Sequence, residues 1–212
     1  MPSNGLLYPP ASIEDIPFVT RPIGEGGVLE RKGMVEVISS LEPNGRAIPY
    51  DIRMGVWVTV EGETEYIRNC FEEYNAHTDP SGRYFTLYKR WHLIGLEVGV
   101  SVASVALRGE ATGVATCWNA DVVATAKRDL KPGDVLDGEG GYTVWGKLLP
   151  AATSTRIGGV PLGLAHDVKV TRPVGKGQSL VWSDVAIDTT TSAYRLRREM
   201  EALFAPPLLK TA

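Results

Sequence analysis

The chain is poor in the residues that build covalent cross-links and metal–thiolate sites. Only two of its 212 residues are cysteines, Cys70 and Cys117, which lie far apart and form no CxxC pair. This spacing argues against a disulfide scaffold and against a zinc–thiolate centre. Because both cysteines stand among apolar residues, we interpret them as small core residues rather than as nucleophiles.

The sequence also lacks a basic block and a segment of membrane-spanning length. Its 22 Lys and Arg residues are balanced by 25 Asp and Glu residues, for a formal net charge of −3, so we expect no nucleic-acid binding. The apolar run at residues 93–107 is shorter than the roughly 20 residues that cross a bilayer, and the N-terminus has no signal-peptide pattern. We therefore expect a cytoplasmic protein without membrane contact.

A glycine-rich segment at residues 24–27 is the only hint of a phosphate-binding loop. No strand of Val or Ile residues precedes it, and Leu29 with three charged residues follows. This context does not match a dinucleotide-binding fingerprint, so we predict an ordinary loop.

Hydrophobic spacing in the first half predicts an α+β chain. Residues 34–39 and 55–60 alternate as strands do, whereas apolar residues within 63–74 recur with helical spacing. A further helix is expected from Trp91 or His92 to about Leu107. Since this run lacks a polar stripe, we predict a buried central helix.

The second half changes to short strands with Gly and Pro turns, and it contains an internal repeat. Residues 127–136 align with residues 171–180, and an Arg, a turn Gly and a closing Leu coincide in both copies. Each copy is expected to form a strand, a tight turn and a strand, with the Gly at positive φ. Two such units suggest a small pseudo-symmetric β domain. A final helix is predicted with Ser192 as its cap and Leu196, Met200, Leu203 and Phe204 on one face, and Pro206 and Pro207 would end it.

One stretch, residues 88–97, places a base, an imidazole and a carboxylate at the start of the apolar run at residues 93–107. Glu97 is the only ionisable residue from Leu93 to Leu107. It lies either solvated at a helix edge or buried, and burial is costly unless the carboxylate is paired. Buried ionisable groups are frequent in active sites, so this stretch suggests an enzyme.

Two resemblances extend this interpretation. Residues 124–136, 161–166 and 176–185 resemble the SAF domain, a β-clip fold of antifreeze-type proteins, sialic acid synthases and flagellar chaperones. Residues 50–60 and 88–97 are similar to the post-Rossmann part of homoserine-dehydrogenase-like oxidoreductases that carry a C-terminal SAF domain. That group includes the 1-deoxy-D-xylulose 5-phosphate reductoisomerase-like enzymes of isoprenoid biosynthesis.

The resemblance implies NAD(P) as cofactor, bound by a Rossmann domain that this chain lacks. The partners we expect are a small-molecule substrate, a Rossmann domain or chain acting in trans, and a second copy in a possible homo-oligomer. A divalent metal is also conceivable, with Asp51, Asp79 and Glu97 as oxygen ligands. No local acidic cluster marks such a site, so the metal requirement stays open.

The resemblance also suggests roles for individual residues. Lys89 and His92, at helical i, i+3 spacing, would polarise or protonate a carbonyl during hydride transfer. Glu97, too far round a helix to pair with His92, would meet a partner from another segment or orient a substrate hydroxyl. Lys89, His92 and Glu97 are thus the candidate catalytic residues; the candidate substrate-binding residues are Asp51, Arg53, Tyr88 and Arg90.

Plainer roles are open for the same residues. Lys89 and Arg90 would then be solvated, and His92 would cap the helix. Arg53 is as well suited to an edge-strand ion pair as to clamping a phosphate or carboxylate.

Together these patterns predict an α+β chain with three parts. They are an oxidoreductase catalytic or substrate domain at 1–118, a SAF domain at 119–188, and a C-terminal helix and tail at 189–212. The function expected is the substrate-binding portion of an NAD(P)-dependent oxidoreductase acting on a small polar sugar phosphate or hydroxy acid. The alternatives are a non-catalytic SAF-type carbohydrate-binding or assembly module, and a truncated inactive product.

Overall fold

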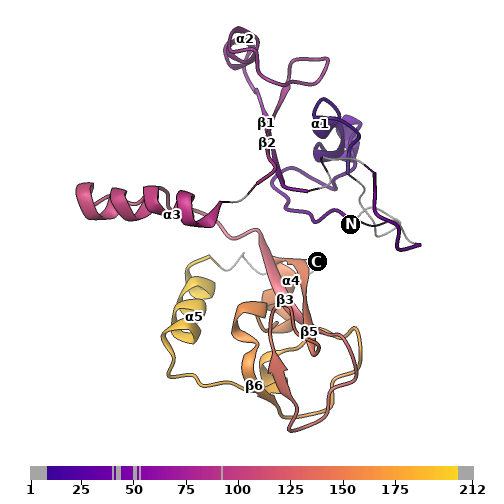
Figure 1. Ribbon diagram of the computed structural model, residues 1–212, viewed down its shortest axis with the longest axis vertical. Coiled ribbons are helices and arrows are strands. Elements are labelled where there is room, and N and C mark those ends of the chain that lie inside the picture. The colour runs from indigo at the N-terminus through magenta and orange to yellow at the C-terminus, as the bar shows by residue number, and fades with distance from the viewer. Residues whose placement is uncertain are drawn as a thin grey trace, which may run out of the picture. The chain divides into compact units, whose positions relative to one another are not determined.

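A computed structural model describes residues 9–39, 41, 44–49, 52, 54–91 and 93–204. The chain divides into two compact units, Met1–Val114 and Ala115–Ala212. Helices make up 31% of the described residues and strands 25%, so the α+β class predicted from the sequence is confirmed. The units are described separately below (Figure 1).

A β-hairpin with a helical tip organises unit 1. Strand β1 (Val56–Glu61) pairs antiparallel with β2 (Tyr84–Lys89), from Val56 opposite Lys89 to Glu61 opposite Tyr84. Helix α2 (Glu65–Glu73) lies in the connection between them (Figure 1) and begins at Thr64, whose hydroxyl accepts the Ile67 amide. Both the strand and the helix that the spacing predicted here are confirmed.

The two faces of this hairpin differ in how far the rest of unit 1 covers them. One face carries Trp57 and Thr59, and Thr59 Oγ1 lies 2.5 Å from Thr20 Oγ1 at the end of helix α1 (Ile16–Thr20). Ile16 is fully buried there. The other face carries aliphatic side chains that stay 45–64% exposed: Val56, Val58, Val60 and Leu87. The valines of β1 thus point away from the packed side, and Trp57 points towards it.

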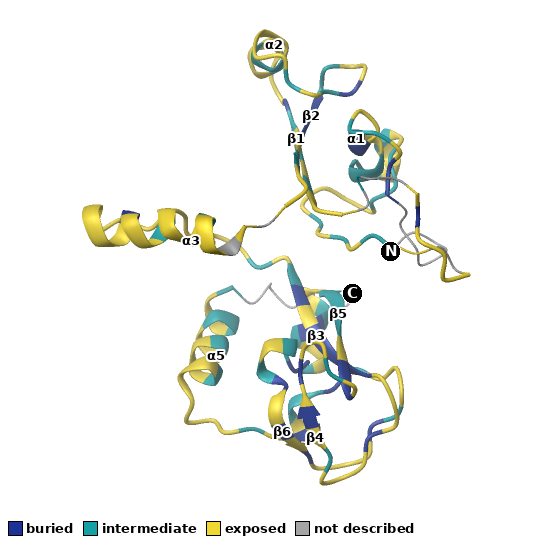
Figure 2. Cartoon of the chain, viewed as in Figure 1, coloured by how far each residue is buried: buried dark blue, intermediate teal, exposed yellow. Residues whose placement is uncertain are grey.

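Helix α3 (Ile94–Ala103) continues as a π-helix, η3 (Ser104–Arg108), and ends at Gly109 with φ of 67°. The predicted helix is therefore confirmed, but its predicted burial is wrong: its side chains are largely exposed (Figure 2). Its few polar residues, at i, i+4, i+7 and i+11, do form a stripe, which the apolar composition concealed. They are Glu97, Ser101, Ser104 and Arg108.

The chain after α3 folds back onto this stripe. Ser101 Oγ lies 2.9 Å from Thr112 Oγ1, and Ser104 Oγ donates to the Glu110 carbonyl at 2.9 Å. Ser104 is consequently the most enclosed residue of the segment, at 5% exposure. The helix therefore satisfies its polar stripe within its own chain and leaves its aliphatic sides uncovered.

Two further predictions are wrong. Residues 34–39 form no strand, and Val35 and Val37 are 59% and 70% exposed. Alternation alone does not make a strand when no neighbouring strand accepts its hydrogen bonds. Both cysteines are free thiols, but Cys117 is exposed and Cys70 is half-buried, so neither is a core residue.

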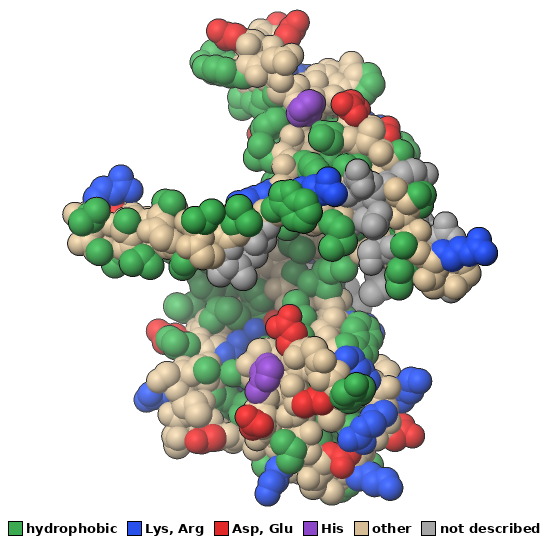
Figure 3. Space-filling view, viewed as in Figure 1, with side chains coloured by type: hydrophobic (Ala, Val, Ile, Leu, Met, Phe, Trp, Pro, Cys, Tyr) green, Lys and Arg blue, Asp and Glu red, His purple; other side chains and the backbone are tan. Residues whose placement is uncertain are grey.

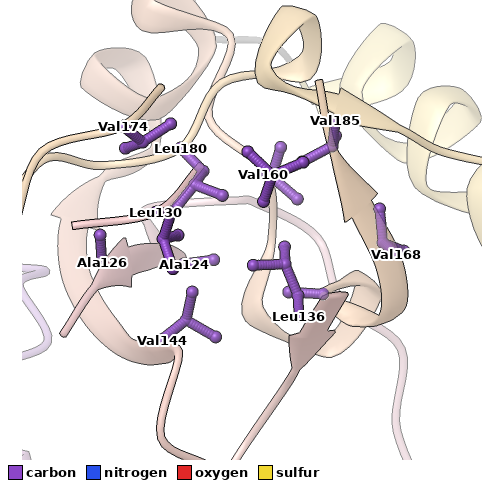
Figure 4. Close-up of a cluster of buried hydrophobic side chains, with 12 residues drawn as sticks. Ala124, Ala126, Leu130, Leu136, Val144, Val160, Val168, Val174, Leu180 and Val185 are labelled. Carbon is purple, nitrogen blue, oxygen red and sulfur yellow. The ribbon is translucent and has the colours of Figure 1, made fainter. Parts of the chain in front are cut away.

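Unit 2 is built from two small antiparallel sheets. Strand β3 (Ala120–Ala126) pairs with β5 (Val144–Pro150), and β6 (His166–Val170) lies between β4 (Val135–Asp137) and β7 (Val185–Ala186). Short helices connect them: α4 (Ala151–Ile157), η4 (Leu162–Leu164) and η5 (Trp182–Asp184). Their apolar side chains converge in one core, with Leu136, Val160 and Leu180 fully buried (Figure 4).

The internal repeat lies at the centre of this unit, and its two copies pair with each other. Leu130 and Val174, at equivalent positions, exchange both backbone hydrogen bonds, at 2.8 and 3.1 Å. Gly133 donates to the Val170 carbonyl, and the equivalent Gly177 donates to the Ala126 carbonyl, each at 2.8 Å. The two glycines have φ of 93° and 81°, so the predicted turn conformation is confirmed. Unit 2 therefore has local pseudo-twofold symmetry.

Helix α5 (Ser192–Phe204) packs onto unit 2 through a buried ion pair. Arg197 binds the Asp121 carboxylate with both terminal nitrogens, at 2.9 and 2.5 Å, and its guanidinium lies over the Trp118 ring. The predicted helix is confirmed, but its cap is Thr191, whose hydroxyl accepts the Tyr194 amide, rather than Ser192.

Candidate functional site

The predicted site residues that the structure describes, Tyr88, Lys89, Arg90 and Glu97, lie at or just beyond the open end of the hairpin of unit 1. Since Val56 lies opposite Lys89, the start of β1 and the end of β2 share one end of the sheet. Gly55 makes this approach close: a Cβ atom there would lie 2.5 Å from the Lys89 carbonyl oxygen, and its φ is 121°. The segment before β1 and the segment leading to α3 are thus brought together.

Lys89 and Glu97 form the central contact of this site. Lys89 Nζ lies 2.5 Å from Glu97 Oε1, with the side chains 61% and 33% exposed. The same Glu97 oxygen accepts the Leu93 amide at 3.4 Å, so it also holds the first turn of α3. Of the two roles expected for Glu97, a partner from another segment or orientation of a substrate hydroxyl, the structure shows a contact with Lys89, a residue of the same 88–97 stretch that ends β2.

The helical relation predicted between Lys89 and His92 is wrong. Lys89 ends a strand and α3 begins only at Ile94, so i, i+3 spacing does not place the two on one helix face. The helical pattern was extended too far towards the N-terminus, since residues 84–89 alternate as part of the hairpin. His92 itself lies outside the described residues.

The aromatic residues beside Lys89 are engaged within the chain. The Tyr88 hydroxyl donates to the Met54 carbonyl at 2.7 Å, and its ring centroid lies 6.4 Å from that of Trp57. The Arg90 guanidinium lies 4.8 Å from the centre of the Trp91 ring. Asp51 and Arg53 precede Met54 in sequence but lie outside the described residues.

Trp57, which the sequence reasoning did not single out, lies at this end of β1 on the opposite face of the sheet from Lys89. Its indole N–H is buried and makes no hydrogen bond within the described part of the chain. A buried donor without a partner is uncommon in folded proteins. The alternation of β1 predicted that Trp57 faces away from the valines, but no sequence pattern revealed its neighbour Tyr88.

Of the three proposed metal ligands, Asp51 lies outside the described residues, and Asp79 and Glu97 lie at opposite ends of the hairpin. Asp79 lies at the other end of the hairpin, where its buried carboxylate accepts hydrogen bonds from Ser81 and the Tyr84 amide and pairs with Arg21. Among the described residues, no three His, Cys, Asp or Glu side chains are placed to hold a metal ion. Asp79 is thus a turn-forming residue.

A charge network that the sequence did not reveal lies at this second end of the hairpin. Glu61 is paired with both Lys32 and Arg83, which also contact Glu25 at 3.0 and 3.4 Å. Lys32 first, and then Arg83, hold the pKa of Glu61 below its usual value. These groups neutralise one another, which suits fixing the loop before β1 rather than acid–base chemistry.

An open cavity of about 650 Å³ also lies at this end, between α2 and the loop at residues 75–82. Its lining is polar and includes Arg68, Asn69 and Asp79. None of the predicted site residues that the structure describes lines it, so this cavity and the Lys89–Glu97 pair are separate.

In the parts that the structure describes, no helix has both the length and the apolar character needed to cross a membrane.

Comparison with known proteins gives a match to a family model. No curated protein matches the chain. Residues 1–98 match the family model described as the catalytic domain of oxidoreductase DRL, a segment that includes every predicted site residue. By this similarity, the first part of the chain is of the oxidoreductase catalytic kind.

Proposed function

We propose that the first unit is the substrate-binding half of an NAD(P)-dependent oxidoreductase that acts on a small polar sugar phosphate or hydroxy acid. The observation that carries this proposal is the Lys89–Glu97 pair at the open end of the hairpin, within the segment similar to an oxidoreductase catalytic domain. The homoserine-dehydrogenase-like and reductoisomerase-like resemblance supplies the reaction class.

Lys89 has the properties that a carbonyl-activating donor needs. Its ammonium has three N–H donors, and it stays 61% exposed while Glu97 fixes its position. When a carbonyl carbon accepts a hydride, negative charge develops on the oxygen, and a positioned cation stabilises that charge. Glu97 would position Lys89, and His92 would deliver the proton.

The substrate's anionic or hydroxyl groups would be bound by the four candidate substrate-binding residues. Arg53 and Arg90 are suited to a phosphate or carboxylate because guanidinium forms paired hydrogen bonds with such groups. Asp51 would accept bonds from sugar hydroxyls, and Tyr88 would form an aromatic wall stiffened by its bond to Met54.

The hydride donor would be held by another domain or chain. All named strands in the described residues pair antiparallel, whereas a Rossmann domain needs a parallel sheet and a glycine-rich turn. NAD(P)H would supply the hydride when a Rossmann domain presents it in trans. The two free thiols fit a reducing compartment, so we include a cytoplasmic location in the proposal.

Unit 2 is proposed to be the SAF-type domain. Its pseudo-twofold pairing of two strand–turn–strand copies supports a β-clip arrangement, in agreement with the resemblance of residues 124–136 and 176–185. In this proposal it is an accessory module to the catalytic half.

Reconstitution tests the proposal. The purified chain is expected to bind no NADPH in a fluorescence titration and to gain NADPH-dependent reductase activity when a Rossmann domain encoded beside it is added. A Lys89→Ala, His92→Ala double variant should lose at least about 100-fold in turnover, as loss of a positioned proton donor does. The surface variant Lys176→Ala is the matched control.

Two results would contradict the proposal. Tight NADPH binding by the chain alone would show that the nucleotide site lies within it. Unchanged turnover of the double variant would remove the carbonyl-side role and favour a non-catalytic module.

A further inference from the structure

The open cavity beside α2 contains an arginine whose charge no described residue neutralises. Arg68 is half-buried in the lining of this cavity of about 650 Å³. Its Nε donates to the Thr64 carbonyl at 3.3 Å, and its terminal nitrogens make no hydrogen bond or ion pair with the described part of the chain. Arginine is rarely enclosed without a paired group. The free donors therefore point to a ligand that the described chain does not supply.

The carboxylates beside Arg68 are also without ion pairs among the described residues. Glu65 and Glu72 stand three residues before and four residues after Arg68, so the three side chains share one face of α2, and all three line the cavity. Residues at this spacing commonly pair. Here the Arg68 side chain instead runs back to the Thr64 carbonyl and bonds neither carboxylate. The helix thus presents one cation and two anions to the same hollow.

The loop on the other side of the cavity is fixed and polar. Asp79 is 6% exposed, and its carboxylate is taken up by Arg21, by Ser81 and by two backbone amides of its own turn. It therefore shapes the wall rather than binding a ligand. The side-chain amides of Asn69 and Asn75 also line the cavity and make no hydrogen bond with the described residues. Each amide can both donate and accept.

We propose that this cavity binds a free α-amino acid with a polar side chain. Arg68 binds the ligand's carboxylate, because a guanidinium forms two parallel hydrogen bonds with such a group. Glu65 and Glu72 bind its ammonium, which has three donors and no acceptor. Asn69 and Asn75 meet the polar side chain. None of these residues belongs to the Lys89–Glu97 site, so the proposal is independent of the proposed reaction.

The charges of the lining disfavour simpler ligands. A phosphate at Arg68 would lie beside two carboxylates, and acidic side chains gather over α2 at the top of the space-filling view (Figure 3). A neutral polyol would leave all three charges of the helix uncompensated. A bare metal ion is disfavoured because no three His, Cys, Asp or Glu side chains among the described residues are placed to hold one. A ligand with both a carboxylate and an ammonium matches the lining.

Isothermal titration of the full chain with L-glutamine, L-asparagine, L-serine and L-threonine gives the first test. At least one of them should bind with a dissociation constant of about 1 mM or below. Its carboxamide analogue and the acid that lacks its amino group should each bind about tenfold or more weakly, because each loses one charged contact. Absence of binding by all four, equal affinity for the two analogues, or binding of inorganic phosphate instead would overturn the proposal.

Substitutions on α2 locate the ligand. Arg68→Gln should weaken binding of the amino acid about 10- to 100-fold, since it removes a charged donor. The Glu65→Gln, Glu72→Gln double variant should weaken binding of the amino acid but not of the acid that lacks its amino group. Glu73→Gln, at an exposed position of α2 outside the lining, is the matched control and should change neither affinity. Unchanged affinity in Arg68→Gln, or an equal loss in the control, would contradict this placement. The comparison of ligand analogues needs no variant, so it decides the question even if a variant fails to fold.

Discussion

Glu97 joins the end of β2 to the first turn of α3, since one of its oxygens both lies 2.5 Å from Lys89 Nζ and accepts the Leu93 amide at 3.4 Å. The two contacts are separable. The ion pair is partly solvated and is expected to add under about 1 kcal/mol, whereas the bond to the amide satisfies one of the donors that a helix start leaves free.

Glu97→Gln should therefore keep the first turn of α3 ordered, because an amide oxygen still accepts the Leu93 N–H. Glu97→Ala should fray it and speed amide hydrogen exchange at residues 93–97 by several-fold. Lys89→Met should behave like Glu97→Gln. Equal exchange in Glu97→Ala and the wild-type chain would show that the carboxylate does not hold the helix start.

Asp121 and Arg197 connect β3 to α5 in the other unit, and they are buried, at 6% and 12% exposure. Arg197→Ala should cost unit 2 about 3–5 kcal/mol, because it leaves a buried carboxylate without its cation. Arg198→Ala removes a 48%-exposed guanidinium from the same helix and should cost under about 1 kcal/mol. Denaturant-dependent hydrogen exchange of the β3 amides measures unit 2 alone, and equal losses would contradict this assignment.

The pseudo-twofold symmetry predicts equal effects at its two turns. Gly133 and Gly177 have positive φ and open space around the position of a Cβ, so an alanine there meets backbone strain and no clash. Gly133→Ala and Gly177→Ala should each destabilise unit 2 by about 1–2 kcal/mol. Gly163→Ala, with equal space and no positive φ, should change stability by less than about 0.5 kcal/mol. Markedly different losses of stability at the two turns would show that the two glycines are equivalent in structure but not in energy.

The sequence predicted the elements of this chain better than their environment. The extents of β1, α2 and α5 follow from local spacing and capping residues, and the paired turns follow from the internal sequence repeat. Burial of α3 did not follow, because burial depends on what else surrounds the helix. The four polar residues of α3 form one stripe, and the chain that follows the helix covers that stripe and leaves the aliphatic sides exposed.

The candidate site was predicted only in part, because its contacts also depend on which other elements lie nearby. The Lys89–Glu97 contact was anticipated only as some partner for Glu97, because pairing across a strand–helix junction has no fixed spacing. The link between Tyr88 and Met54 depends on the hairpin register, which the sequence of either strand alone does not define. Asp79 was named as a metal ligand only in principle, and its carboxylate is taken up by hydrogen bonds within its own turn.

Asp137 gives unit 2 a predicted acid dependence. The Thr143 hydroxyl, and then the Tyr142 and Thr143 amides, lower the pKa of Asp137 from 3.8 to about 2. A carboxyl whose folded-state pKa is depressed stabilises the fold above its unfolded pKa and loses that contribution as the pH falls through the folded one. The window therefore runs from about pH 4 down to about pH 2. Because Asp137 is exposed, solvent screening limits the effect to about 1 kcal/mol or less.

Asp137→Asn and Thr143→Val test this dependence. Both should be less stable than the wild-type chain at pH 6, and the difference for Asp137→Asn should shrink as the pH falls from 4 to 2, because only the wild-type carboxylate is being protonated. Hydrogen exchange is slow in this range, so urea unfolding followed by far-ultraviolet circular dichroism is the suitable measurement. A stability difference that stays constant between pH 6 and pH 2 would mean that the carboxylate is not stabilised by these donors in its charged form.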